Sequence, residues 1–200
     1  YTEEKITNII NDAGIQVLIG SEHDWNSIKD KLGNAHNVKY LLFPNGNNNY
    51  QGKINVISKD DIEIATRLQR PIDTDPDRNI YIMFTSGSTG KPKGVQVSNR
   101  NVSYLLDNMR VYYDLEPGFN ASQTFDLSFD LSVSDMFFTW TSGGTLCVLP
   151  EEELNCPADY INREKIEFWH SVPTLADFLY KLGFLNPQMY PSLQYSLFCG

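Results

Sequence analysis

The chain has 200 residues, 41% of them hydrophobic, which is enough to bury a core in a domain of ordinary size. Its formal net charge of −9 argues against nucleic acid as a partner, because no basic stripe offsets the acidic surplus. The three cysteines and three histidines lack metal-ligand spacing, which argues against a zinc site or a disulfide framework. The sequence has no signal-peptide pattern and no long apolar run, so we expect a cytoplasmic protein without a membrane partner.

The first third of the chain alternates between helical and strand patterns. The expected elements, in order, are a helix over 2–12, a strand over 15–19, an amphipathic helix carrying Trp25, Ile28 and Leu32, a strand over 38–43, a strand over 54–57 and a helix over 59–69. A connection rich in proline and aspartate follows over 71–77. This connection is the best candidate for an internal boundary.

Two expected strands, 79–84 and 94–98, enclose a loop rich in glycine and hydroxyl residues, Thr85-Ser86-Gly87-Ser88-Thr89-Gly90-Lys91-Pro92-Lys93. Glycines let backbone N–H groups turn toward an anion, hydroxyls add donors, and lysine supplies a mobile positive charge. This combination is typical of a polyphosphate-binding loop. A solvated linker is the alternative, but a linker needs neither flanking strands nor a proline between two lysines. A Walker-type loop matches poorly, because Pro92 follows Gly90-Lys91 where serine or threonine is required.

Residues 81–94 resemble the phosphate-loop signature of the adenylate-forming superfamily. This superfamily includes acyl-CoA synthetases, luciferases, adenylation domains of nonribosomal peptide synthetases and D-alanine–carrier protein ligases. The resemblance implies a reaction in which a carboxylate attacks the α-phosphate of ATP, giving an acyl-adenylate and pyrophosphate. It also implies that the ATP phosphates are bound by Thr85, Ser86, Gly87, Ser88, Thr89, Gly90 and Lys93.

Helical and strand patterns continue to alternate after the loop. The expected elements are a helix from Ser98 to Leu115, a helix around 133–140, a turn at Gly143-Gly144, a strand over 145–149, a helix near 157–165, a strand over 167–172, a helix over 173–182 opened by Pro173 and a strand over 194–199. Such alternation predicts an α/β fold of layered, mostly parallel sheets flanked by helices. Trp140, Trp169 and His170 are expected in the core or in the wall of a cleft rather than as catalysts.

Residues 125–137 place three aspartates, Asp126, Asp130 and Asp135, among aromatic and aliphatic side chains. A carboxylate in such a setting needs a cationic partner or hydrogen bonds from the chain. One interpretation is helix capping by Asp130 or Ser132. The other is a carboxylate kept for the ammonium group of a ligand.

Phe129-Asp130-Leu131-Ser132 resembles the Phe-Asp-x-Ser motif of amino-acid-activating members of the superfamily. The resemblance implies that Asp130 binds the substrate α-amine, with Asp126 as a competitor in a shifted register. It further implies that the amino-acid pocket is completed by Leu131, Ser134, Thr174, Leu197 and Cys199. Cys199 in a Phe-Cys-Gly context favours the D-alanine–carrier ligase branch.

The resemblance covers essentially the whole chain, yet several family elements are missing from it. The glutamate that binds magnesium, the aspartate that binds ribose and the C-terminal lid domain with its catalytic lysine are all expected beyond Gly200. The chain is therefore expected to be a fragment of a large N-terminal domain, with 1–75 and 76–200 as two segments of that domain. No metal site and no activity are expected within the chain alone.

The function implied by the resemblance is activation of an amino acid as aminoacyl-AMP, with ATP and Mg²⁺, in nonribosomal peptide synthesis or D-alanine ligation. The aminoacyl group would then pass to the phosphopantetheine thiol of a carrier protein. Two alternatives stay open. One is an acyl- or aryl-CoA synthetase, and the other is a non-catalytic nucleotide-binding module.

Overall fold

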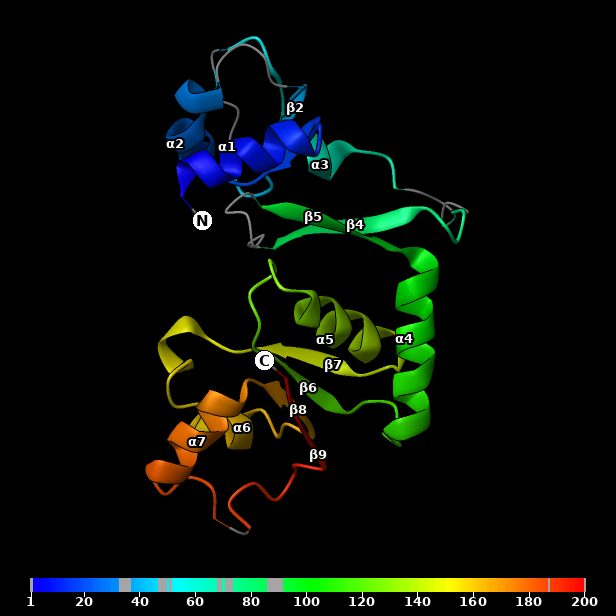
Figure 1. The fold of residues 1–200 in the computed structure, drawn as a ribbon, viewed down its shortest axis with the longest axis vertical. Coiled ribbons are helices and arrows are strands. Elements are labelled where there is room, and N and C mark those ends of the chain that lie inside the picture. The colour runs from blue at the N-terminus through cyan, green and yellow to red at the C-terminus, as the bar shows by residue number, and fades with distance from the viewer. Residues whose placement is uncertain are drawn as a thin grey trace. The chain divides into compact units, whose positions relative to one another are not determined.

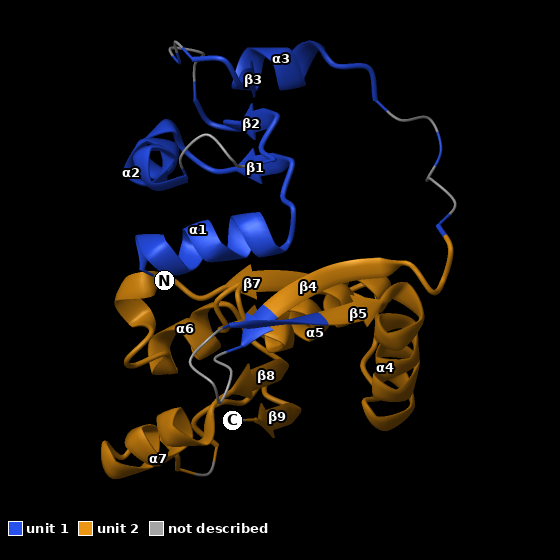
Figure 2. Cartoon of the chain, turned by 45° about the horizontal axis from the view of Figure 1, so that its top comes forward, with its two compact units in different colours: residues 1–74, 84–95 blue, residues 75–83, 96–200 orange. Residues whose placement is uncertain are grey.

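The computed structural model describes residues 2–32, 37–46, 50, 52–67, 70, 74–85, 92–186 and 188–199. The chain divides into two compact units, unit 1 with residues 1–74 and 84–95, and unit 2 with residues 75–83 and 96–200 (Figure 2). The division falls within the expected Pro/Asp-rich connection, and residues 84–95 group with unit 1. That 1–75 and 76–200 belong to one larger domain stays a prediction.

The described part of unit 1 contains a small parallel sheet with helices beside it (Figure 1). Its elements are α1 (Glu3–Asp12), β1 (Val17–Ile19), α2 (Glu22–Leu32), β2 (Tyr40–Leu42), β3 (Asn55–Ile57) and α3 (Lys59–Ile64). Trp25 and Ile28 of α2 pack with Ile10 of α1 and Leu41 of β2 in one apolar core. The expected order of helices and strands is confirmed.

The helix expected over 59–69 is shorter in the structure. It begins at a capping box formed by Ser58 and Asp61 and ends at Ile64, because Ala65 adopts an extended backbone. No residue of α3 is buried. Since helix stability in proteins comes mostly from packing, a helix without buried residues has little to extend it.

The two strands expected around the glycine-rich loop are present. β4 (Asn79–Thr85) and β5 (Lys93–Ser98) form a two-stranded sheet. At the start of β4, the Asn79 Nδ2 donates a hydrogen bond of 2.8 Å to Gln96 Oε1 of β5.

Unit 2 contains a four-stranded parallel sheet in the order β7-β6-β8-β9 (Figure 1). The elements, after β4 and β5, are α4 (Asn99–Tyr112), β6 (Asn120–Gln123), α5 (Asp130–Thr141), β7 (Thr145–Val148), η1 (Glu151–Glu153), α6 (Ala158–Arg163), β8 (Phe168–Ser171), α7 (Pro173–Lys181) and β9 (Tyr195–Phe198). The three-stranded sheet of unit 1 and the four-stranded sheet of unit 2 are parallel and carry helices, as the α/β prediction required.

Several boundaries in unit 2 follow the local sequence. Ser98 is the N-cap of α4, as expected, and forms a capping box with Asn101. Pro173 opens α7, where its missing N–H costs no helical hydrogen bond. α4 ends at Tyr112 and not at Leu115, because the backbone of the next residue is extended.

The middle of unit 2 departs from the sequence-based expectations in several details. The helix expected around 133–140 is present as α5 but begins at Asp130, three residues earlier, with Phe129 as an N-cap that makes no side-chain hydrogen bond. β6, with the sequence Asn-Ala-Ser-Gln, was not expected because it contains no β-branched or aromatic residue. Trp140 is 53% exposed and is therefore not a core residue, whereas Trp169 is buried.

The two faces of the unit 2 sheet carry different helices (Figure 1). On one face, Phe168 of β8 packs with Val133 and Phe138 of α5 and with Leu106 of α4. On the other face, the next residue of β8, Trp169, packs with α6 and α7. This alternation buries β8 along its whole length.

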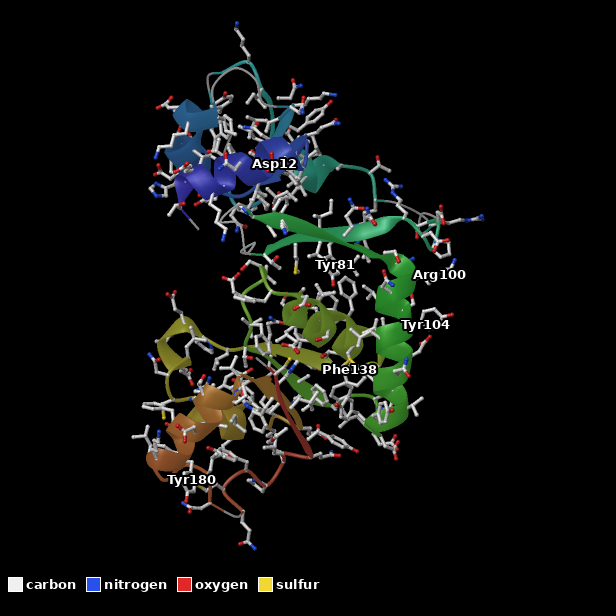
Figure 3. All side chains as sticks on the ribbon, viewed as in Figure 1. Asp12, Tyr81, Arg100, Tyr104, Phe138 and Tyr180 are labelled. Atoms are coloured by element: carbon white, nitrogen blue, oxygen red, sulfur yellow. The ribbon has the colours of Figure 1, made fainter. Side chains whose placement is uncertain are left out.

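We predict that Phe138→Ala lowers the free energy of unfolding of the full-length protein by about 3–5 kcal/mol, because it leaves a cavity among Phe119, Phe168 and Tyr113. Phe138 is 1% exposed, whereas Tyr104 on the outer side of α4 is 64% exposed (Figure 3). Tyr104→Ala is the matched aromatic control and should change the same quantity by less than about 0.5 kcal/mol. Equal losses in denaturant titrations of the two variants would contradict this assignment of the core.

Candidate functional site

The order of the unit 2 sheet reverses between β6 and β8. From β6 the chain passes through α5 to β7 on one side, and then through α6 to β8 on the other side of β6. In open parallel α/β sheets, ligands bind outside the carboxyl ends of the strands at such a reversal. The carboxyl ends of β6 and β8 are therefore the candidate site in unit 2.

At the carboxyl ends of β6 and β8, side-chain hydroxyl groups form hydrogen bonds with the backbone of β8. The described ladder between β6 and β8 consists of one residue pair, Ala121 with Phe168. Beyond it, the N–H of His170 donates to Ser122 Oγ at 3.1 Å, and the hydroxyl of Thr124 donates to the His170 carbonyl. Side chains of β6 and its following loop thus hold the end of β8.

A buried pair of ionisable side chains links α5 to the same strand end. Asp135 Oδ1 lies 2.8 Å from His170 Nδ1, and the two side chains are 1% and 6% exposed. Burial raises the pKa of the Asp135 carboxyl above its ordinary value, and the hydrogen bond with His170 opposes this rise. Asp135 Oδ2 has no hydrogen-bond partner of normal geometry among the described residues. The ring of Phe125 meets the imidazole edge-on, with centroids 4.8 Å apart.

Sequence reasoning missed this pair. It placed His170 in the core or a cleft wall and weighed Asp126 and Asp130 as ligand-binding acids, but it gave Asp135 no partner. The available signal was that an aspartate within an apolar helix requires a partner, and a histidine within an apolar strand can supply one.

Asp130, the residue predicted to bind an amine, is the first residue of α5 and is exposed. The N-terminus of a helix favours a negative charge there. Its carboxylate forms no hydrogen bond or ion pair with any residue that the structure describes. Burial raises the pKa of the Tyr81 phenol of β4, and the negative charge of Asp130 adds to that rise.

Asp126, the predicted competitor, is occupied in a local turn. Its Oδ1 accepts a hydrogen bond of 2.7 Å from the Ser128 N–H, and its carbonyl accepts one of 3.0 Å from the Phe129 N–H. Hydrogen bonds from the Ser128 side chain and backbone lower the pKa of the Asp126 carboxyl. The capping interpretation fails for Asp130 and Ser132, because Phe129 is the N-cap and the Ser132 hydroxyl donates to its carbonyl.

The remaining residues predicted for the amino-acid pocket lie on elements that meet the carboxyl edge of the sheet. Leu131 and Ser134 are in the first turns of α5, and Thr174 is in the first turn of α7. Leu197 of β9 lies opposite His170 in the strand register, and the Cys199 N–H donates to the Ser171 carbonyl at 3.1 Å. That these residues contact an amino acid stays a prediction.

The predicted phosphate-binding loop is described only at its ends. Thr85 is the last residue of β4, and Lys93 is the first residue of β5. Both residues are exposed. Ser86, Gly87, Ser88, Thr89 and Gly90 lie outside the described residues.

None of the helices in the part of the chain that the structure describes is both long and apolar enough to cross a membrane.

Comparisons with known proteins agree on one family. A family model described as "AMP-binding enzyme" matches residues 1–200. The chain is 36% identical over 128 residues to an L-proline–(L-prolyl-carrier protein) ligase of Pseudomonas fluorescens, covering 62% of this chain and 26% of that protein. It is 41% identical over 128 residues to a D-alanine–D-alanyl carrier protein ligase of Lacticaseibacillus casei, covering 62% of this chain and 25% of that protein. The matched part is about a quarter of each relative's length.

Solved structures share the fold over the full chain. The structure of IdnL7 gives a TM-score of 0.83 at 26% identity, covering 100% of this chain and 39% of that one. The Vibrio cholerae adenylation domain AlmE, solved in complex with glycyl-adenosine-5'-phosphate, gives a TM-score of 0.76 at 28% identity, with coverages of 100% and 39%. The chain therefore has the fold of part of an adenylation domain.

Proposed function

The chain belongs to the AMP-binding enzyme family, and from this premise we propose that its full-length protein activates an amino acid as aminoacyl-AMP. The observation that carries the proposal is Asp130, a carboxylate without a partner among the described residues, at the carboxyl edge of the sheet. A substrate ammonium group is the cation that such a carboxylate would bind. The two amino-acid ligases among the relatives support the same substrate class.

In the proposed reaction, an oxygen of the amino-acid carboxylate attacks the α-phosphorus of ATP. The bond from that phosphorus to the bridging oxygen breaks, and pyrophosphate leaves with the bonding electrons. Asp130 would hold the ammonium group, with Leu131, Ser134, Thr174, Leu197 and Cys199 around the side chain. The loop from Thr85 to Lys93 would hold the phosphates that leave.

The aminoacyl group is proposed to pass to the phosphopantetheine thiol of a carrier protein. The thiol sulfur would attack the carbonyl carbon of the adenylate, and AMP would leave. The relatives are named as carrier-protein ligases, which supports this partner. The proposal includes a cytoplasmic location, where ATP is available, and no nucleic-acid or membrane partner.

Mg²⁺ is proposed as the companion ion of ATP. No group of three or more histidine, cysteine, aspartate or glutamate side chains that could hold a metal is found among the described residues. Because Mg²⁺ bound with a nucleotide is usually held by one or two carboxylates and by the phosphates, the roles proposed here for the described residues do not involve the ion.

The test is amino-acid-dependent exchange of pyrophosphate into ATP by the full-length protein. Twenty L-amino acids, glycine and D-alanine form the panel, with fatty and aryl acids beside it. We expect exchange with one or a few amino acids. Exchange with only fatty or aryl acids would indicate a CoA synthetase, and exchange with no acid would indicate a nucleotide-binding module.

We predict that Asp130→Ala raises the KM for the amino acid by roughly ten- to a hundredfold, because a charge-assisted hydrogen bond of about 1.5–3 kcal/mol is lost. The KM for ATP should stay close to its original value, since uniform binding of the ammonium is lost and the phosphate loop is unchanged. Asp126→Ala is the matched control and should leave both constants near their original values. If Asp126→Ala raised the amino-acid KM and Asp130→Ala did not, the amine-binding aspartate of the motif would be Asp126.

We predict that Lys93→Ala lowers kcat/KM for ATP by roughly ten- to a hundredfold, because it removes a positive charge from the phosphate-binding loop. Lys181→Ala, which removes an exposed lysine of α7 paired with Asp177, is the control and should have no effect. Steady-state exchange kinetics at varied ATP measure the difference. Unchanged kinetics in Lys93→Ala would assign this lysine to the solvated surface.

A further inference from the structure

The serine and threonine hydroxyls of α5 are bonded to their own helix or to its N-cap. The helix hydroxyls donate to nearby carbonyls, Ser132 to Phe129, Ser134 to Leu131, Thr139 to Asp135 and Thr141 to Phe137. Among the described residues of α5, Asp135 alone forms a side-chain hydrogen bond with a strand of the sheet. Val133 and Phe138 of α5 pack with Ala121 and Phe168 of the sheet in one apolar core.

Apolar packing is not directional, so it fixes the distance of a helix from a sheet better than its rotation or its position along the axis. A hydrogen bond of 2.8 Å between two buried side chains restricts all three. The strand side of this bond is itself held, because the backbone N–H and carbonyl of His170 are both bonded to hydroxyls of Ser122 and Thr124. The bond therefore ties α5 to the carboxyl ends of β6 and β8.

Asp130 has no comparable restraint. It lies five residues before Asp135, which is about 7.5 Å along a helix axis, and its side chain has no partner among the described residues. Because α5 is a continuous helix, a shift at Asp135 moves Asp130 as well. A misplacement of about 1 Å can cost about a hundredfold in a reaction that depends on orientation.

We propose that the Asp135–His170 hydrogen bond sets the position of Asp130, so that His170 is a positioning residue for the substrate amine. This inference rests on the proposed function of Asp130. Stability alone does not require this pair, since apolar residues can often replace a buried ion pair without loss of stability. What two apolar residues cannot replace is the directional hydrogen bond between Asp135 and His170.

The test compares His170→Asn with His170→Leu in the full-length protein. Asparagine and leucine branch alike at Cγ, but only asparagine can place a donor where Nδ1 lies. We expect His170→Asn to keep the amino-acid KM within about twofold of the wild type. His170→Leu should raise that KM by about tenfold, with the ATP KM within about twofold. Equal KM values for the two variants would overturn the proposal.

His170→Leu leaves the buried Asp135 carboxyl without its histidine partner, which is strongly destabilising. The double variant Asp135→Leu with His170→Leu removes both polar groups and is the second measurement. We expect it to fold with a raised amino-acid KM, and a wild-type KM would overturn the proposal. His23→Asn changes an exposed histidine of α2 in unit 1 and is the matched control, expected to alter neither KM.

Two outcomes separate this inference from the proposed function. If the wild type uses an amino acid but the double variant keeps its KM, the inference falls and the function stands. If no amino acid supports exchange by the wild type, the function falls, and hydrogen–deuterium exchange of residues 125–135 still tests the hydrogen bond. Faster exchange of this segment in the double variant than in His170→Asn would support the inference that the hydrogen bond fixes α5. Equal exchange in the two variants would overturn that inference.

Discussion

The hydrogen bonding of β8 at its carboxyl end is the constraint on which the candidate site depends. β8 is buried along its whole length, yet its ladder with β6 is a single described pair. A buried N–H or carbonyl without a partner costs about 1–3 kcal/mol, so other groups must replace the ladder. Ser122 and Thr124 do so at His170. Side chains of β6 and of the loop after it thereby hold the carboxyl end of β8 at the point where the sheet order reverses.

Three aspartates within ten residues have three different environments, and the environment decides what each can do. Asp126 is exposed and accepts hydrogen bonds in a turn, which favours its charged form. Asp135 is buried against a histidine, and burial opposes its charge. Asp130 is exposed at a helix start, where the helix dipole favours a carboxylate. Of these three, Asp130 alone has no hydrogen bond or ion pair with a described residue, and it begins the helix that follows β6.

The fold by itself does not select the substrate, since one fold serves several chemistries. Family membership places the chain among AMP-binding enzymes. In the proposed function, the preference for an amino acid over another carboxylic acid rests on one residue, Asp130, whose carboxylate would pair with the substrate ammonium group. The overall charge of −9 makes local positive groups such as Lys93 more important for a polyphosphate ligand.

The sequence by itself determined the α/β class, the order of most elements, the N-cap at Ser98, the helix start at Pro173 and the motif at Asp130, because these depend on local periodicity and helix-terminal signals. It missed β6, whose polar residues conflict with strand propensity but satisfy the backbone of β8. It also missed the pairing of Asp135 with His170, which are 35 residues apart. Only the tertiary structure decided these features, because sheet order and partners distant in sequence leave no local pattern.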